Sequence, residues 1–243
     1  MNILGIDTST PGSAACVLRG DGEAFEVEPA PERLTAPPGH ARELMPAVAR
    51  CMDRSGLAWR ELDAVAVGVG PGPFTGLRIG VTTARGLASA HGAELRPISS
   101  LAALAAGVGD STLGGDGSST APEAGPGDGS RQILATIDAR RGEVFAALYE
   151  DGATVWEPFV AAPEALAARI RDGRIAPLGV GDGSVRFRDV LETAGVDVAP
   201  DESRAHVVRG LAVCGVAATT APVPVEAVLP DYLRLPDAKP RTP

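Results

Sequence analysis

Residues 67–92 read VGVGPGPFTGLRIGVTTARGLASAHG, and this stretch decides how the chain is organised. The residues from Ala64 to Val69 form a short apolar run of strand length, and the glycines and prolines at 70–73 then exclude regular structure. A helix is predicted to begin at Thr75, whose hydroxyl caps it, and to end near His91. The stretch therefore predicts a strand, a tight turn and a helix in succession.

The start of such a helix can bind an anion, because unpaired backbone N–H groups and the positive end of the helix dipole meet there. The stretch has neither the Lys-Ser/Thr pair of a Walker phosphate loop nor the spacing G-x-G-x-x-G. The alternative is that the glycines let two backbones approach closely, and the sequence favours this second interpretation.

The predicted helix 75–91 carries two apolar or small faces on nearly opposite sides. The first face consists of Leu77, Gly80, Val81, Ala84, Leu87 and Ala88. The second consists of Ile79, Thr83, Gly86 and Ala90. One face is expected to pack on the sheet and the other on a further helix, and periodicity alone leaves open whether that helix belongs to this chain or to a partner.

A second helix is predicted from about His40 to Ser55, with a wide apolar face. The predicted partner interface combines this face with the second face of the helix 75–91, and its residues are Leu44, Val48, Met52, Ile79, Thr83, Gly86 and Ala90. His40 does not begin an H-x-x-x-H metal motif, since Leu44 occupies the place of the second histidine. We therefore expect no metal site, and we expect His40 to be a surface or interface residue.

Composition limits the class of function. The chain has 31 acidic and 22 basic residues and a net charge of -9, so nucleic acid is an unfavourable primary ligand. The cysteines, Cys16, Cys51 and Cys214, are widely spaced and form no C-x-x-C, which predicts reduced thiols and a cytoplasmic protein. The start of the chain lacks a basic region, and no apolar run approaches the roughly 18 residues that span a membrane, so neither secretion nor membrane insertion is expected.

Amino-acid composition and the spacing of apolar residues predict that the chain has four parts. Residues 1–106 are predicted to form an N-terminal lobe that carries both partner-binding helices, and 107–131 a flexible low-complexity insertion. Residues 132–228 are predicted to form a second lobe, whose last helix, 204–218, could pack back on the first lobe. Residues 229–243 are expected to form an extended tail.

The opening hairpin, whose first strand runs into the motif I-D-T-S-T, resembles the first phosphate hairpin of the actin, hexokinase and Hsp70 superfamily. In that superfamily an aspartate and hydroxyl groups at the first turn hold metal and nucleotide phosphate. The resemblance makes Asp7, Thr8 and Ser9 candidates for a vestigial nucleotide-binding site. The alternative, which the short motif favours, is that Asp7 caps a turn while Ser9 and Thr10 bond to the backbone.

Four motifs in the same order resemble the bacterial TsaB family, formerly called YeaZ. They are GIDTST at 5–10, GVGPGPFTGLRIGVTTARGLA at 68–88, IDARRGEVFAALY at 137–149 and PDYLR at 230–234. The resemblance covers nearly the whole chain apart from the predicted insertion. It implies an α/β protein with a two-lobed actin-like (Hsp70-like, ASKHA) fold, in which helices pack on mixed sheets.

The resemblance also implies a function. Proteins of this family are non-catalytic scaffold subunits of the complex that makes threonylcarbamoyladenosine next to the anticodon of tRNA. They bind and support a catalytic paralogue, TsaD, and an ATPase, TsaE, completes the complex. In the family, the helices that correspond to 40–55 and 75–91 pack against the equivalent helices of the paralogue. When the paralogue is absent, they pack against those of a second copy in a homodimer. The resemblance therefore implies that this chain has no catalytic residue. It also implies no cofactor, because ATP and magnesium belong to the partners, and contact with tRNA only through the complex.

The alternative function is a stand-alone actin-fold small-molecule kinase or ATPase. It would need a second phosphate loop and an adenosine loop. The candidates are the segment 137–140, where Arg140 replaces the glycine of a D-x-G loop, and the glycine-rich segment 179–184. Because the segment 137–140 lacks the glycine of a phosphate loop, the sequence favours the scaffold function. Weak nucleotide binding would still be compatible with a scaffold.

Overall fold

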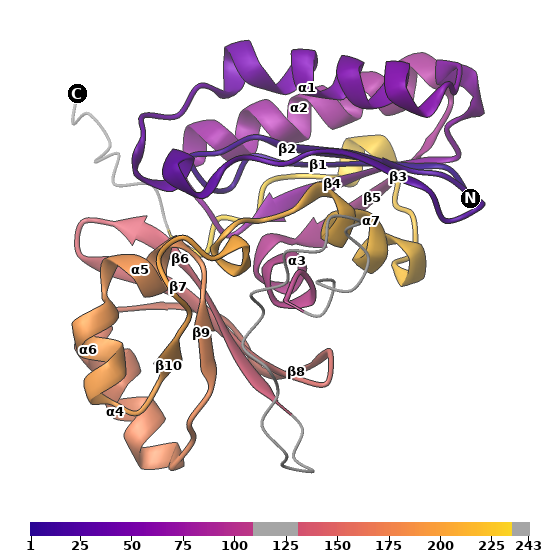
Figure 1. Cartoon of the computed structure of the whole chain (residues 1–243). Coiled ribbons are helices and arrows are strands. Elements are labelled where there is room, and N and C mark those ends of the chain that lie inside the picture. The colour runs from indigo at the N-terminus through magenta and orange to yellow at the C-terminus, as the bar shows by residue number, and fades with distance from the viewer. Residues whose placement is uncertain (109–130, 235–243) are drawn as a thin grey trace, which may run out of the picture.

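The computed structural model describes residues 1–108 and 131–234. Most of the predicted insertion, 109–130, and most of the predicted tail, 235–243, lie outside the described residues, so the expectations for them stay predictions. The described part contains two five-stranded sheets, one built from the first half of the chain and one from the second (Figure 1).

The first sheet has the order β3-β2-β1-β4-β5. Its strands are β1 (Ile3–Asp7), β2 (Ala14–Leu18), β3 (Ala24–Val27), β4 (Ala64–Gly70) and β5 (Glu94–Ser99). The pairs β1–β2 and β2–β3 are antiparallel, whereas β4 runs parallel to both β1 and β5, so the sheet is mixed. Strand β1 is buried along its whole length, because helices cover both faces of the sheet.

Two long helices, α1 (His40–Ser55) and α2 (Phe74–His91), lie side by side on one face of the first sheet (Figure 1). Side chains such as Leu4 and Ile6 of β1 point to this face and form one core with both helices. The helices α3 (Ser100–Ala106) and α7 (Gly210–Thr219) cover the opposite face and fill the space between the two sheets. Because successive side chains of β1 point to opposite faces of the sheet, this strand contributes to two separate cores.

The second sheet has the order β10-β9-β6-β7-β8 and is also mixed. Its strands are β6 (Gln132–Arg140), β7 (Glu143–Glu150), β8 (Ala153–Ala161), β9 (Leu178–Val180) and β10 (Asp197–Val198). Its outer face packs against α4 (Pro163–Gly173) and α6 (Arg188–Thr193), where Leu166, Ile170 and Leu191 form a third core. The short helix α5 (Asp182–Arg186) follows β9. Four short 3-10 helices complete the described elements: η1 (Pro31–Thr35), η2 (Trp59–Glu61), η4 (Arg204–His206) and η5 (Val225–Ala227).

The predicted α/β architecture with helices packed on mixed sheets is confirmed, but some details were wrong. Helix α2 begins at Phe74 rather than at Thr75, and no side chain caps it. The last helix begins at Gly210, because residues 204–206 form the separate turn η4, capped by the hydroxyl of Ser203. Within 1–108 and 131–234, no helix has both the length and the apolar character needed to cross a membrane.

Candidate functional site

The turn after β1 holds the three predicted nucleotide-binding residues, and all three are buried. The carboxylate of Asp7 accepts hydrogen bonds from the backbone N–H and the hydroxyl of Ser9, at 2.7 and 2.6 Å, and from the hydroxyl of Ser100 at 2.7 Å. Burial raises the pKa of Asp7, while the hydroxyl groups of Ser9 and Ser100 act in the opposite direction. The hydroxyl of Thr8 donates to the carbonyl oxygen of Gly76 at 2.8 Å. The side chains of Asp7, Thr8 and Ser9 are thus committed to contacts inside the chain. Asp7 caps the turn, as the alternative interpretation of the motif predicted, whereas the hydroxyl of Ser9 bonds to the carboxylate of Asp7 and not to the backbone.

Glycines make this close packing possible. A Cβ at Gly68 would lie 1.8 Å from a carboxylate oxygen of Asp7, and a Cβ at Gly76 would lie 2.2 Å from the backbone oxygen of Thr8. Both distances are far inside van der Waals contact, so a larger residue at Gly68 would force the turn away from β4, and one at Gly76 would force it away from α2. Gly68 and Gly76 therefore serve the close approach of β1, β4 and α2, the interpretation that the sequence favoured.

The turn between β6 and β7, the candidate second phosphate loop, is closed by ion pairs. A carboxylate oxygen of Asp138 lies 2.5 Å from Arg186 and 3.1 Å from Arg140. The backbone N–H of Asp138 donates to the buried carboxylate of Asp182 at 2.9 Å. Burial raises the pKa of Asp182 to about 6. The carboxylate of Asp138 is neutralised by this chain's own arginines.

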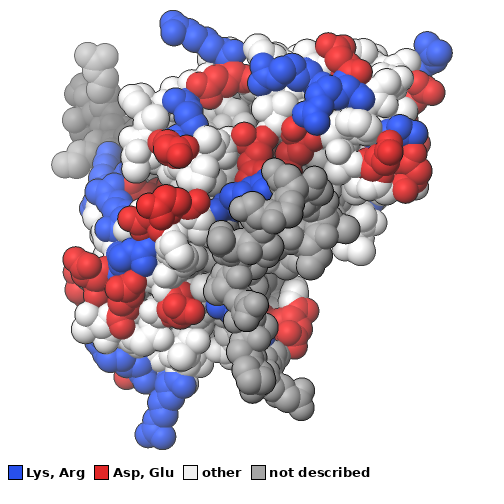
Figure 2. Space-filling view, viewed as in Figure 1, with Lys and Arg blue, Asp and Glu red and all other residues white. Residues whose placement is uncertain are grey.

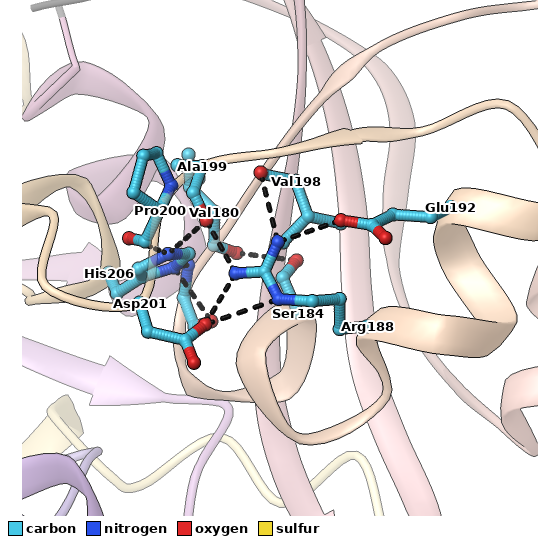
Figure 3. Close-up of polar contacts among 10 residues, drawn as sticks. Val180, Ser184, Arg188, Glu192, Val198, Ala199, Pro200, Asp201 and His206 are labelled. Carbon is cyan, nitrogen blue, oxygen red and sulfur yellow. Dashed lines mark hydrogen bonds and ion pairs between the residues drawn. The ribbon is translucent and has the colours of Figure 1, made fainter.

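The glycine-rich segment 179–184 is also held by contacts within the chain (Figure 3). The ring of His206 accepts the backbone N–H of Gly181 at 3.1 Å, and its Nε2 contacts the carbonyl oxygens of Ala199 and Pro200, each at 3.0 Å. The guanidinium of Arg188 donates to the carbonyl oxygen of Ala199 at 2.6 Å. Arg188 therefore holds the loop at 199–200, which in turn contacts the ring of His206. Burial lowers the pKa of His206, so the ring is neutral at pH 7.

Part of the predicted partner interface is wrong. Leu44, Val48 and Met52 are between 0% and 3% exposed and belong to the core between α1, α2 and the first sheet. The wide apolar face of α1 packs on this chain's own strands β2 and β3, so it cannot also line a surface. His40, predicted to be a surface or interface residue, is likewise buried in this chain, and its Nδ1 contacts the hydroxyl of Ser13 at 2.8 Å.

The remaining predicted residues lie on the outer side of α2. Ile79 and Thr83 are half-buried, whereas Gly86 and Ala90 are exposed. The predicted interface left out Met45 and Ala49 of α1, although the apolar arc predicted for this helix extends to both. Met45 is 44% exposed and Ala49 is exposed as well, because both lie at the edge of that arc, beside its buried residues. The outer sides of α1 and α2 together form one surface, which we call the helix face (Figure 1).

Acidic and basic side chains are interspersed over both lobes on the side shown in Figure 2. Cys16, Cys51 and Cys214 are free and buried. In the part of the chain that the structure describes, no three His, Cys, Asp or Glu side chains are grouped so that they could hold a metal ion.

Comparisons with known proteins agree with this architecture. A family model described as TsaD, tRNA N6-adenosine threonylcarbamoyltransferase, matches residues 31–168. An uncharacterised protein of Mycobacterium leprae (strain TN) is 36% identical over 163 residues, which are 66% of this chain but 39% of that protein, so the match spans less than half of the relative.

Two further relatives match almost from end to end. The tRNA threonylcarbamoyladenosine biosynthesis protein TsaB of Escherichia coli (strain K12) is 32% identical over 244 residues, which cover 96% of this chain and 95% of that protein. The solved structure of YeaZ from Pseudomonas aeruginosa is 27% identical and has a TM-score of 0.71, covering 96% of this chain and 99% of its own. This chain therefore belongs to the TsaB family, also named YeaZ, and its two mixed sheets form the actin-like fold of that family.

Proposed function

We propose that this chain takes part in making threonylcarbamoyladenosine in tRNA, as a non-catalytic scaffold subunit that binds a TsaD-like catalytic paralogue. The observation that carries the proposal is the nearly end-to-end likeness to the E. coli protein named for this biosynthesis. The match of a TsaD family model over 31–168 supports a paralogous partner, because that range includes both α1 and α2. A paralogue with the same two helices could pack them against the helix face.

Gly86 supports the proposal that the paralogue contacts the outer side of α2. A glycine inside a helix costs about 1 kcal/mol relative to alanine. A Cβ at Gly86 would meet no neighbouring atom within 4 Å, so packing within the described chain does not explain this residue. A second helix that approaches closely would explain it, and the small side chains of Thr83 and Ala90 on the same side would allow the same approach.

The non-catalytic role is supported by the two turns that hold nucleotide in other actin-like proteins. Asp7 is bonded to Ser9 and Ser100, and Asp138 is paired with two arginines. A carboxylate with such partners is poorly placed to bind a magnesium nucleotide. We therefore assign ATP and magnesium to the partners, including a TsaE-like ATPase, and not to this chain.

The same proposal covers the remaining partners. The net charge of -9 and the interspersed charges of Figure 2 favour contact with tRNA through the complex rather than through this chain alone. Three free buried thiols fit a reducing compartment such as the cytoplasm. Without the paralogue, the helix face is expected to pair two copies of this chain, because exposed apolar surface such as Met45 would otherwise face water.

The test compares two arginine substitutions in a binding assay with the TsaD-like paralogue from the same organism. Gly86→Arg places a long charged side chain on the helix face, where the chain itself has room for it. Ala165→Arg is the matched control, since Ala165 is an exposed small residue on α4 of the other sheet. We expect both variants to fold, and only Gly86→Arg to lose the partner and the modification of tRNA in a reconstituted reaction.

Three outcomes would contradict parts of the proposal. Normal partner binding by Gly86→Arg would remove the helix face as the interface. Rapid ATP hydrolysis or threonylcarbamoyl transfer by the isolated chain would exclude a non-catalytic role and favour the stand-alone kinase or ATPase. A concentration-dependent dimer that Gly86→Arg leaves intact in sedimentation would mean that two copies pair through another surface.

A further inference from the structure

The two helices of the helix face carry a charge opposite to that of the whole chain. Helix α2 contains two arginines and no acidic residue. Helix α1 contains three arginines and two acidic residues, so the two helices together have a net charge of +3 when histidine is neutral. The whole chain has a net charge of -9. A local excess of positive charge on an acidic chain attracts a negatively charged surface.

Four of these arginines lie among or beside the exposed apolar residues of the helix face, and we call them the arginine rim. They are Arg42 and Arg50 on α1, and Arg78 and Arg85 on α2. The first three are exposed, and Arg85 is half-buried. None of the four forms an ion pair with a residue that the structure describes. Their charges are therefore available to a partner.

The acidic residues of α1 do not balance the arginine rim. Glu43 is already paired with Arg33, whose guanidinium lies 2.7 Å from the Glu43 carboxylate. Asp53 is exposed and is the other acidic residue of the two helices. The fifth arginine, Arg54, donates to the carbonyl oxygen of Glu26 on β3 at 3.0 Å, so it lies at the side of α1 next to the sheet. The arginine rim thus outnumbers the one exposed carboxylate of the helix face.

One arginine of the rim is held in position by contacts within the chain. The guanidinium of Arg78 stacks over the ring of Phe74, 4.0 Å from its centroid, and its Nε donates to the hydroxyl of Tyr232 at 3.2 Å. The rings of Phe74 and Tyr232 are themselves stacked, with their centroids 5.1 Å apart. Ordering a long side chain opposes binding, and these contacts reduce that cost for Arg78.

Pairing of two copies through the helix face would bring two arginine rims together. In a dimer with two-fold symmetry, both copies contribute the same surface, so the excess charge of one copy faces the same excess on the other. Like charges that face each other across an interface oppose association. Apolar residues such as Met45 and Ile79 favour this pairing, whereas the arginine rims weaken it.

We propose that the arginine rim selects an acidic protein surface and disfavours a second copy of this chain. The selected partner places carboxylates around a small apolar centre that covers Met45 and Ile79. Nucleic acid is also negatively charged, but exposed apolar side chains such as Met45 mark a contact with protein. The inference rests on the proposed function, because it states the chemistry by which the TsaD-like paralogue is preferred to a second copy.

Salt distinguishes the two kinds of pairing, because it screens charges at a surface. Sedimentation measures self-association, and surface plasmon resonance measures binding of the paralogue from the same organism, at about 50 and about 500 mM NaCl. We expect high salt to weaken binding of the paralogue at least about threefold and to strengthen self-association. A contact governed by apolar burial alone would respond to salt in the same direction in both assays.

Charge reversal on α1 provides a matched test. Arg42→Glu/Arg50→Glu reverses two exposed arginines of the rim. Arg171→Glu/Arg174→Glu makes the same change at two exposed arginines at the end of α4, on the other lobe. At low salt, the α1 double variant is expected to weaken binding of the paralogue at least about tenfold, and the α4 double variant to leave it nearly unchanged. Circular dichroism verifies that both double variants keep the fold.

A mixture of two chains tests the arginine rim without the paralogue. The α1 double variant reverses two charges, which changes the net charge of its two helices from +3 to -1. The wild-type chain should therefore pair with this variant more tightly than with itself at low salt. Sedimentation of the labelled variant with unlabelled wild-type chain measures this preference.

Four results would overturn the inference. Two of them are binding of the paralogue that high salt does not weaken, and equal weakening by the two double variants; in both, the paralogue still binds and the proposed function stands. The third is a wild-type chain that prefers itself to the α1 double variant. The fourth is binding of tRNA by the isolated chain that only the α1 double variant loses, since the helix face would then bind nucleic acid. A paralogue that binds at neither salt concentration would contradict the proposed function, and the inference with it.

Discussion

The hydroxyl of Thr8 donates a hydrogen bond to the carbonyl oxygen of Gly76, 2.8 Å away, and so joins the end of β1 to the first turn of α2. The contact depends on a glycine, because a Cβ at Gly76 would lie 2.2 Å from the backbone oxygen of Thr8. Later in the same helix, a Cβ at Gly86 would enter open space. One helix thus contains a glycine that packing requires and another that packing within the described chain does not explain.

This difference gives a direct test of the fold. Gly76→Ala is expected to destabilise the chain by about 1–3 kcal/mol, because backbone must move to relieve the overlap. Gly86→Ala is expected to stabilise it by up to about 1 kcal/mol, through helix propensity alone. Urea unfolding of the two variants measures both changes. Similar effects of the two substitutions would mean that α2 is not seated on β1 as described.

The helix α1 offers a second pair of substitutions that separate core from surface. Val48 is 0% exposed and Met45 is 44% exposed, although they are only three positions apart. Val48→Glu would bury an unpaired carboxylate, at a cost of several kcal/mol (about 3–5) if it stays charged, so we expect loss of the fold in circular dichroism.

Met45→Glu is the matched variant, because it places the same side chain on the helix face. It is expected to keep the wild-type melting curve while weakening binding of the paralogue. A folded Val48→Glu variant would contradict the packing of α1 on the first sheet. An unfolded Met45→Glu variant would show that the helix face is needed for folding itself.

The sequence predicted most of the helices and strands, but it did not identify everything that packs against them. Helix α1 was predicted at its observed bounds, and the first face of α2, with Leu77 and Val81, is buried as predicted. The same periodicity assigned Val48 to a partner interface, because it identifies an apolar face without identifying what covers it. Strands β2 and β3 cover that face.

The surroundings of His40 could not be predicted for a related reason. Its ring was expected at a surface or interface, but it is buried and its Nδ1 contacts the hydroxyl of Ser13, which lies 27 residues earlier in the sequence. Only the fold brings these two residues together.

The buried carboxylate of Asp182 predicts a specific dependence of stability on pH. Burial raises its pKa from 3.8 to about 6, so the folded chain binds a proton more tightly than the unfolded chain. Stability from this group is therefore present below about pH 4 and is lost as the pH rises through about 6. A shift of about two units corresponds to roughly 3 kcal/mol.

Asp182→Asn should remove this loss while keeping a side-chain oxygen for the backbone N–H of Asp138. The variant is expected to match the wild type near pH 4 and to be more stable by up to about 3 kcal/mol at pH 7, in urea unfolding. Asp172→Asn, at an exposed position on α4, is the control and should show no such trend. A constant difference across the pH range would contradict the burial of Asp182.

The reactivity of the thiols of Cys16, Cys51 and Cys214 tests whether the helices α1 and α7 stay packed on the first sheet in solution. All three are free and 0% exposed. Burial raises the pKa of Cys51 to about 11, and its thiol donates to the carbonyl oxygen of Ala15 at 3.3 Å. Because the thiolate is the reactive form, reaction with a disulfide reagent at pH 8 should be very slow in the folded chain and should release three equivalents in urea. Ser89→Cys, at an exposed position on α2, supplies a thiol that should react at once under native conditions. A native cysteine that reacts at a comparable rate would show that α1 or α7 separates from the first sheet far more often than its buried core allows.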